Sequence, residues 1–372
     1  MIRKQPSGLI LAISCALIQL MAARSGYSHE DLSGPVWTNG QFQFTLNYWN
    51  GITFAIESSP DLVNWTPIFT NTDSSDQLLI TLDAPDDSMF YRAVAFLPPI
   101  EFSYALGAVG SIAMNGNGLV SDSFNSADTN LSTNGQYDPA KASTNGNVAS
   151  VQGIVNIGNH TIFGNLYLGP TATCTNNPDQ ITGTIYTNYN VRFPDVTLPN
   201  TDTNGNQIEW LAAAPIVGSG GIYTNYFTSN GYYDINNNYP IFVQTNVSVT
   251  VDVKSSSYSP GGLTINGGTT NSGTLVMYQK SGTVTLGGNS GGGAIHNRPQ
   301  NFIYFGLPGV SSITLSIGTN FVGVIYAPEA SLTLNGGGDI NNFEGSAIIQ
   351  TVALNGHYTF HFDESLLTLG PF

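Results

Sequence analysis

A motif that recurs about every 20 residues constrains the fold of this chain more than any other feature. Gly323 and Gly345 lie in two similar apolar runs 22 residues apart, and Leu334 and Leu354 close the segments that follow, 20 residues apart. A related unit surrounds Gly164. Short runs of β-branched and aromatic residues between tight turns predict β-strands. Recurrence at this period is typical of proteins whose repeats stack on one another.

The repeat predicts an all-β protein: a right-handed parallel β-helix (solenoid) with a small N-terminal antiparallel β-sandwich. Layers of such a solenoid stack about 4.8 Å apart, and glycine occupies bends where a Cβ would clash. Only 9% of the residues are charged and 42 are glycine, which excludes coiled coils and helical bundles. The 41% hydrophobic content excludes wholesale disorder. The alternative is an ordinary β-sandwich with coincidental glycine spacing.

The order of composition along the chain predicts four parts. Residues 1–25 have the basic start, short apolar stretch and small-residue end of a secretory signal peptide. A retained membrane anchor or lipidation at Cys15 are the alternatives. Residues 26–97 form the predicted sandwich, and the prolines of 98–101 the linker. Residues 102–372 form the predicted β-helix domain, with an excursion at about 193–246 that contains one helical candidate, Asn206–Ala214.

Two resemblances follow from specific motifs. Residues 56–66, followed by Phe90-Tyr91-Arg92, resemble a small β module of exported bacterial proteins that has an S-x-D-L-x-x-W pattern. There Trp65 is interpreted as a core residue and Asp61 as a turn residue, with sugar stacking by Trp65 as the alternative. Over Phe102–Leu366 the chain resembles an uncharacterised exported bacterial domain with a G-x-[IV]-Y-A-P element and an F-H-[YF]-D-E-x-L ending. The matching segments are 111–118, 122–126, 145–149, 323–328 and 360–366.

The second resemblance implies a β-helical surface or pilus-associated domain of unknown activity. Members linked to pilin-like N-termini carry a processing site before a long apolar helix, and the leader of this chain lacks one. The sequence therefore leaves open whether the protein is part of a pilus.

The charge of the chain limits the partners that it can bind, and its cysteine content limits the disulfides that it can form. The formal net charge is −15, and the few basic residues are scattered, so nucleic acid and anionic lipid are excluded as partners. Cleavage of the leader leaves Cys174 alone, so no intramolecular disulfide can form. Flanked by threonines, Cys174 is interpreted as a small packing residue and not as a nucleophile.

Few side chains form patterns that suggest chemistry. His357 and His361 would lie about 13 Å apart in a strand, which excludes a zinc pair, whereas His361 and Asp363 would share a face about 6.6 Å apart. A hydrogen-bonded end cap formed by 357–367 is the favoured interpretation. Two Asp-x-Asn-x-Asn segments, Asp202/Asn204/Asn206 and Asp234/Asn236/Asn238, resemble the start of a calcium-binding loop, and Asx-rich turns are the alternative. The sequence does not decide whether a metal ion binds.

The sequence singles out no catalytic or cofactor-binding residue, which favours a secreted or cell-surface protein with a structural or adhesive role and without catalytic activity. Cell-surface polysaccharide or other surface proteins are the expected partners, and membrane insertion is not expected. The alternative is a carbohydrate-binding protein, or a carbohydrate-active enzyme of the lyase or glycosidase type, that uses aromatic side chains as stacking platforms. The candidates are Trp65, Trp210 and the aromatics between Tyr223 and Tyr239.

Overall fold

The structure is a computed structural model that describes most of the chain. The described residues are 31–38, 41–47, 53–72, 77–83, 89–96, 102–115, 117–175, 178–187, 193–202, 204–211, 213–266, 272–286, 298–315, 320–335 and 340–369. The predicted signal peptide at 1–25 and the predicted linker at 98–101 lie outside these ranges. Within them, no helix is both long and apolar enough to cross a membrane.

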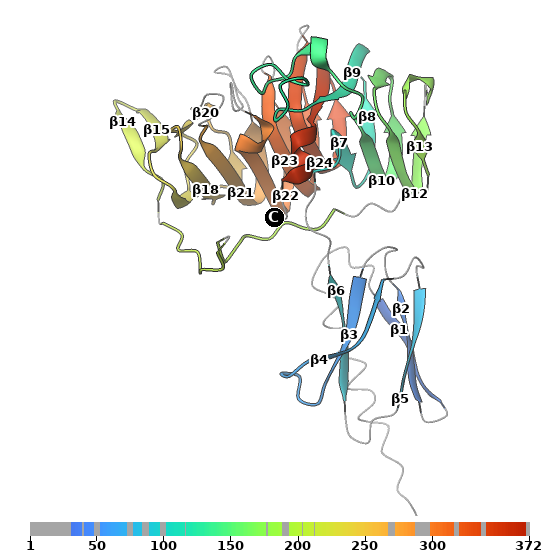
Figure 1. Cartoon of the computed structure of the whole chain (residues 1–372). Helices are drawn as coiled ribbons and strands as arrows, with labels where there is room; N and C mark the ends of the chain where they lie inside the picture. Colours follow the sequence, from blue (N-terminus) through green and yellow to red (C-terminus); the bar gives the residue numbers. More distant parts are fainter. Residues whose placement is uncertain are drawn as a thin grey trace, which may run out of the picture. The chain divides into compact units, whose positions relative to one another are not determined.

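The chain divides into two compact units, residues 1–98 and 99–372 (Figure 1). The first contains two antiparallel three-stranded sheets. One has the order β1 (Asp31–Thr38), β2 (Gln41–Asn47), β5 (Gln77–Asp83), and the other β4 (Thr66–Thr72), β3 (Thr53–Ser59), β6 (Phe90–Phe96). Alternate apolar residues from both sheets form one buried cluster of Phe42, Phe44, Leu46, Ile56, Ile80 and Tyr91.

The regular secondary structure of the second unit consists of strands and, in the described residues, four short 3₁₀ helices, η1 (Pro139–Lys141), η2 (Pro178–Gln180), η3 (Pro299–Asn301) and η4 (Glu364–Thr368). Its strands are β7 (Leu106–Ala108), β8 (Ile112–Met114), β9 (Asn117–Phe124), β10 (Val148–Asn156), β11 (Asn159–Ile162), β12 (Leu166–Thr175), β13 (Ile185–Tyr186), β14 (Ile216–Ser219), β15 (Ile222–Phe227), β16 (Gly231–Ile235), β17 (Ile241–Val243), β18 (Ser248–Val253), β19 (Ser257–Tyr258), β20 (Leu263–Ile265), β21 (Thr274–Leu286), β22 (Phe302–Leu315), β23 (Phe321–Leu334), β24 (Asn341–Leu354) and β25 (Tyr358–Asp363).

The all-β prediction is confirmed, but the right-handed parallel β-helix is wrong. Fifteen strands form one parallel sheet in the order β13-β12-β10-β7-β24-β23-β22-β21-β18-β16, with β8, β9, β11, β19 and β25 attached beside this path. Because β7 and β8 each pair with both β10 and β24, these four strands close a parallel barrel, and the other strands bond outside it. A solenoid would add its strands in chain order, whereas here the first strand of the unit lies between β10 and β24.

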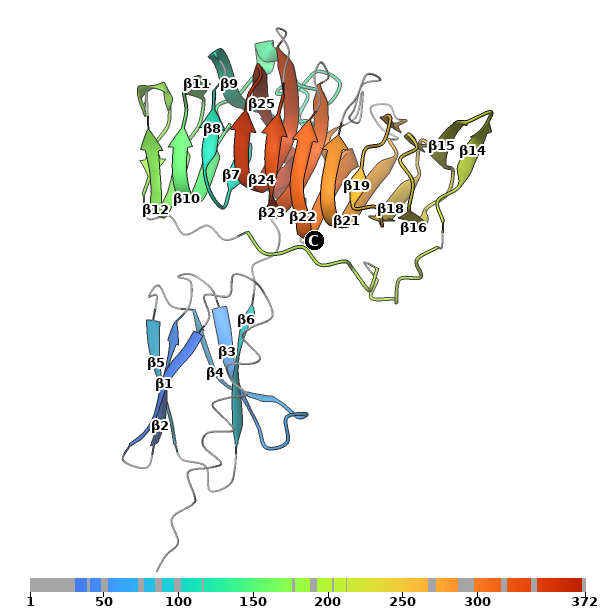
Figure 2. The same cartoon turned by 180° about the vertical axis from the view of Figure 1, so that it is seen from behind.

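This strand order requires a long connection. The chain runs to β13 at one end of the sheet, whereas β16 is the strand at the other end (Figure 2). Between them in the sequence, β14 and β15 belong to a separate four-stranded sheet of order β14-β15-β17-β20. The described residues between 193 and 215 make this passage with isolated bridges only, such as Thr201 to Gln207 and Leu211 to Tyr233. The predicted helix at Asn206–Ala214 is therefore wrong. Backbone pairing to neighbouring segments overrides the weak helical preference of this stretch.

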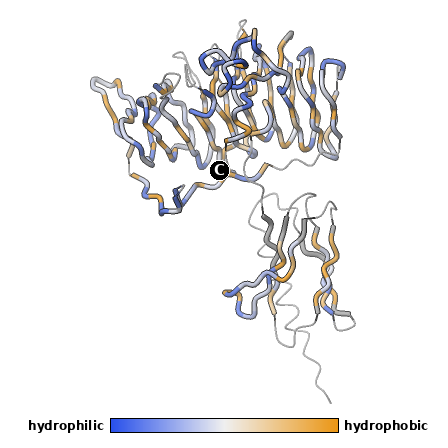
Figure 3. The backbone as a smooth tube through the Cα atoms, viewed as in Figure 1, coloured by the Kyte–Doolittle hydropathy of each residue, from blue (hydrophilic) through white to orange (hydrophobic). Residues whose placement is uncertain are grey.

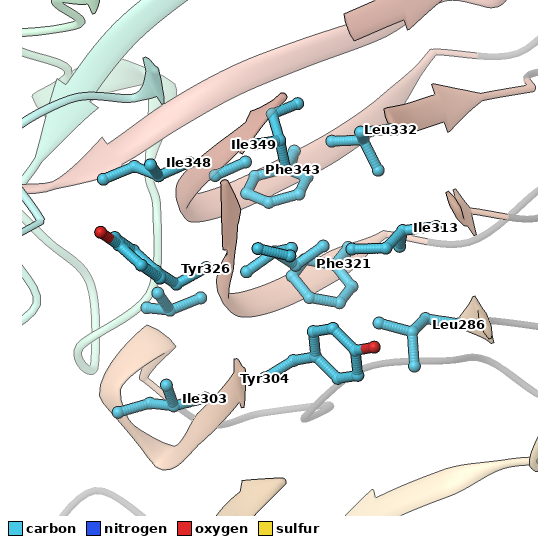
Figure 4. Packing of buried hydrophobic residues seen from close by; sticks show 14 of the residues in the cluster. Leu286, Ile303, Tyr304, Ile313, Phe321, Tyr326, Leu332, Phe343, Ile348 and Ile349 are labelled. Atoms are coloured by element: carbon cyan, nitrogen blue, oxygen red, sulfur yellow. The ribbon is translucent and has the colours of Figure 1, made fainter. Parts of the chain in front are cut away.

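Alternating side chains place the core inside the second unit. In the second half of the long strands β22 and β23, buried apolar residues alternate with less buried polar ones, and Figure 3 shows hydrophobic and hydrophilic residues interspersed along the sheet. Ile303, Tyr304, Phe321, Tyr326 and Phe343 from adjacent long strands are buried against one another (Figure 4). Rings of neighbouring strands stack along the sheet, with Phe321 and Phe343 centroids 4.7 Å apart. This packing determines which side chains of these strands face outward.

The repeated glycines of the sequence mark one close approach between strands. Gly323 of β23 pairs directly with Gly345 of β24. Gly345 has φ +136°, and a Cβ there would lie 1.9 Å from the Gly323 carbonyl oxygen. Only glycine fits this position, which explains the recurrence of the motif in physical terms.

Candidate functional site

An ordered set of small outward side chains, seven of them serine or threonine, lies on β21 to β24 of the second unit. Each of these strands carries a three-residue segment in which a buried apolar residue lies between two outward residues. We call the outward residues the hydroxyl face: Thr283, Thr285, Ser312, Thr314, Ser331, Thr333, Thr351 and Ala353. All are exposed or half-buried, and none is charged.

Parallel pairing aligns these residues in two columns. One column runs from Thr283 through Ser312 and Ser331 to Thr351. The other runs from Thr285 through Thr314 and Thr333 to Ala353. Neighbouring strands lie about 4.8 Å apart, and residues two positions apart in a strand lie about 6.7 Å apart. The hydroxyl face is therefore a nearly rectangular net of small side chains.

The layer beneath the hydroxyl face is buried and apolar. The central residues of the four segments, Val284, Ile313, Leu332 and Val352, are each at most 3% exposed. β-Branched threonines have few χ1 options on a strand, so their hydroxyl and methyl groups keep fixed directions. Ser331 also donates through Oγ to the Ser311 carbonyl at 3.1 Å, which ties adjacent strands together.

The net continues on both sides of the hydroxyl face. Ser257 of β19 pairs with Thr283. At the other edge Ala353 pairs with Ala113 of β8, which pairs with Asn156 of β10. Beyond β10, Thr173 and Thr175 of β12 are exposed. The polar-apolar-polar triplets at the end of each repeat are the sequence signal for this surface. Their periodicity predicted strands, but the surface that the polar residues form together was not predicted.

A second arrangement, the histidine cluster, is formed by Asp122, Tyr137, Asn342, Thr359 and His361. His361 Nδ1 lies 2.5 Å from Asp122 Oδ1, and His361 Nε2 lies 3.0 Å from Thr359 Oγ1. Tyr137 donates its hydroxyl to Asp122 Oδ2 at 2.7 Å, and Thr359 donates to Asn342 Oδ1 at 2.9 Å. A hydroxyl, an imidazole and a carboxylate in this order are the parts of a nucleophile relay.

The relay is closed to substrate. The Tyr137 ring stacks on the His361 ring with centroids 3.5 Å apart, and His361 and Asp122 are 3% and 6% exposed. Burial, assisted by the hydrogen bond to Asp122, raises the pKa of the Tyr137 hydroxyl, so it stays a donor. Burial also raises the pKa of nearby Glu344, and His361 opposes that rise. The histidine cluster therefore joins Tyr137, which lies between β9 and β10 in the chain, to the strands β9, β24 and β25.

The closing segment 357–367 behaves differently from the predicted end cap. β25 is a strand, as expected, but it pairs with β24 on one side and β9 on the other. Tyr358, Phe360 and Phe362 are buried as predicted, yet the opposite face is buried too. Asp363 does not contact His361. It accepts hydrogen bonds from the backbone N–H groups of Ser126 and Ser365 at 2.9 and 3.1 Å.

The two Asp-x-Asn-x-Asn segments have local partners for their aspartates. Asp202 accepts from the N–H groups of Asn204 and Asn206 and from the Asn206 side chain, which lowers its pKa. Asp234 Oδ1 lies 3.1 Å from Lys254 Nζ. Lys254 also contacts the buried carboxylate of Asp252. Burial acts to lower the pKa of Lys254, but these two carboxylates outweigh it and raise that pKa. In the described ranges no three His, Cys, Asp or Glu side chains converge to hold a metal ion.

The candidate stacking aromatics fall into pairs. Trp210 meets Tyr232 edge to face at 5.7 Å, and Tyr223 lies 5.2 Å from Tyr239. All four side chains are half-buried. Each ring therefore uses part of its surface on its partner, which leaves less ring area for a sugar.

The remaining predicted residues lie apart from these sites. Trp65 is half-buried outside the core of the first unit, so its interpretation as a core residue is wrong, and its Nε1 donates to the Leu62 carbonyl at 3.1 Å. Asp61 accepts from the N–H groups of Val63 and Asn64 at 2.9 and 2.8 Å, as a turn residue does. Cys174 is half-buried, and burial raises its thiol pKa, which opposes thiolate formation.

Residues 202–369 match a protein family described as Domain of unknown function (DUF7305). Over that range the chain is similar to an uncharacterised domain, which confirms the predicted resemblance at that coarse level. No curated protein and no solved structure matches the chain.

Proposed function

We propose that the protein is an exported structural or adhesive element of the cell surface, without catalytic activity. The hydroxyl face is the observation that carries this proposal. It is an uncharged net of small side chains that extends across four strands, and a face of this extent suits contact with an extended partner. The finer part of the family resemblance, to surface-associated domains, supports the same location.

The buried relay favours adhesion over catalysis. Thr359 is 8% exposed, and the ring of Tyr137 covers His361. A nucleophile must reach the reacting atom of its substrate, so the relay would have to open before it could act. Its hydrogen bonds instead link β9, β24 and β25, so the cluster has a structural role.

Localisation and adhesion test the proposal together. Antibody labelling of intact cells and fractionation of the culture should place the protein outside the cytoplasm. The purified full-length protein should then sediment with insoluble surface material, and a variant with bulky residues on the hydroxyl face, Thr314→Tyr with Thr333→Tyr, should sediment less. Thr264→Tyr on β20 is the matched control, because Thr264 is an exposed threonine outside the hydroxyl face. A cytoplasmic protein, or equal sedimentation of all three proteins, contradicts the proposal.

Carbohydrate binding through aromatic side chains is the second candidate, and the observation in its favour is that Trp210, Tyr232, Tyr223 and Tyr239 keep part of their surface exposed although their rings are paired. A glycan array with Trp210→Ala tests binding, and a polysaccharide panel assayed for reducing or unsaturated ends tests cleavage. Binding lost in Trp210→Ala but kept in the Thr314→Tyr, Thr333→Tyr variant would move the site from the hydroxyl face to the aromatics.

A further inference from the structure

We propose that Thr359 forms an ester bond with the side chain of Asn342 and thereby links β25 covalently to β24. In this reaction the Thr359 hydroxyl attacks the Asn342 amide, and ammonia is released. The reaction occurs once in each molecule and uses only its own side chains, so no substrate from solution takes part. The inference is independent of the hydroxyl face and of the adhesive function.

The histidine cluster places an amide beside a hydroxyl. Thr359 and Asn342 are direct partners in the parallel pairing of β25 with β24. Thr359 Oγ1 lies 2.9 Å from Asn342 Oδ1 and 3.0 Å from His361 Nε2. The amide carbon is bonded to Oδ1 at about 1.2 Å, so it lies within about 4 Å of Thr359 Oγ1. A small rotation of the amide brings it to the separation of about 3 to 3.5 Å from which attack occurs.

His361 is placed to act first as the base and then as the acid. Asp122 Oδ1 lies 2.5 Å from His361 Nδ1 and holds the ring proton there, which leaves Nε2 to accept the proton of Thr359. Nε2 also lies 3.4 Å from Asn342 Oδ1, so the protonated ring stabilises the negative charge that develops on this oxygen. The ring then gives the proton to the amide nitrogen as the bond to carbon breaks.

The atoms and protons balance without a further reactant. The new bond joins Thr359 Oγ1 to the side-chain carbonyl carbon of Asn342, and the bond from that carbon to Nδ2 breaks. The proton moves from the hydroxyl to His361 and then to the leaving nitrogen, which departs as ammonia. Nothing is oxidised or reduced, and His361 and Asp122 return to their starting states.

Burial favours attack by the hydroxyl over attack by water. Thr359 and His361 are 8% and 3% exposed, and the ring of Tyr137 covers His361. The closure that excludes an external substrate therefore also protects the ester from hydrolysis. Asn342 is half-buried, so ammonia is released at a position that solvent reaches. Its escape into the solvent suppresses the reverse reaction.

Mass spectrometry of the purified protein tests the inference. The intact wild type should be lighter by one ammonia than its amino-acid sequence requires. A succinimide at an Asn-Gly pair has the same mass, so the denatured protein is also digested with a protease that cleaves after glutamate. The digest releases 330–344, which contains Asn342, and 345–364, which contains Thr359. The ester should keep these two fragments joined, and mild alkali should separate them with Asn342 converted to aspartate.

Variants identify the groups that form the bond. Thr359→Val removes the hydroxyl at nearly constant volume and should abolish the joined fragments. His361→Gln should abolish them as well, because glutamine does not relay the proton, whereas Thr359→Ser should still form the ester. Asn355→Gln is the matched control, since Asn355 is an exposed amide just after β24, and it should be linked like the wild type. Unchanged circular dichroism shows that each variant is folded.

A wild type of unmodified mass, or one whose two fragments separate without alkali, overturns the inference. Joined fragments in Thr359→Val also overturn it, because another side chain would then form the link. The sedimentation experiment on the hydroxyl face is read separately. Loss of sedimentation in the Thr314→Tyr, Thr333→Tyr variant of an unlinked protein would leave the adhesive function standing while the ester bond fails.

Discussion

His361 of β25 and Asp122 of β9 meet through Nδ1 and Oδ1 at 2.5 Å, although 239 residues separate them in the chain. The contact closes the second unit, because β25 lies between β9 and β24. Asp122 also accepts from Tyr137, so a single carboxylate holds the end of the chain and the segment that covers it.

Asp122→Asn should therefore destabilise the second unit by about 3 kcal/mol, because removing one partner leaves a buried polar group poorly matched. Denaturant unfolding gives the size of the loss, and faster amide hydrogen exchange in β25 localises it. Asp179→Asn, at an exposed residue, is the control and should change stability by less than about 0.5 kcal/mol. Equal stability of the two variants would show that the contact contributes little.

His160 on β11 should make folding sensitive to acid. Its side chain is fully buried, and burial lowers its pKa from 6.5 to about 4. The unfolded chain binds a proton below pH 6.5 while the folded protein does not until about pH 4, so stability falls as the pH drops through this window. The total loss should be about 3 kcal/mol, since one pKa unit corresponds to about 1.4 kcal/mol.

The measurement compares stability against pH for the wild type and His160→Leu. The raised pKa values of Glu344 and Asp363 act in the opposite direction, but they are present in both proteins and cancel in the difference. The variant should lose the acid-dependent component, and His357→Gln should keep it. Parallel curves for wild type and His160→Leu would refute the prediction.

Gly345→Ala should destabilise the pairing of β23 with β24 by more than about 2 kcal/mol, since the new Cβ meets the Gly323 carbonyl oxygen in a left-handed backbone conformation. Gly261→Ala is the control, because a Cβ there makes an ordinary contact with Pro240 at 3.5 Å. The difference in melting temperature between the two variants is the readout, and equal values would mean that the strands can separate locally without cost.

Truncation after Gly356 removes β25 and should cost several kcal/mol. The truncation removes the buried side chains of Tyr358, Phe360 and Phe362, each of which contributes about 1.5 to 3 kcal/mol when fully buried. In addition, β9 and β24 both lose a neighbouring strand. The exposed edges should promote aggregation, seen by light scattering. Cys174→Ser should behave like the wild type. A monomeric truncated protein with an unchanged melting temperature would contradict the prediction.

Local patterns in the sequence predicted part of the fold. The alternation in Tyr358–Asp363 indicated a strand, and the structure has one there. The glycines of the repeat indicated close backbone approach, which Gly323 and Gly345 make. These features depend on a few consecutive residues, because side-chain direction alternates along any strand.

The tertiary structure alone decided which strands are neighbours. The sequence of a strand indicates which of its faces is apolar. It does not indicate which strand lies beside it, because any two strands can form the same backbone hydrogen bonds. Chain order therefore suggested a solenoid with β25 at its end, whereas pairing of β7 and β8 with β10 and β24 closes a barrel. β25 is buried because it pairs with both β9 and β24, and this pairing also brings His361 to Asp122. The hydroxyl face arises from the pairing of β21 to β24, so each feature became visible only when the strands were placed side by side.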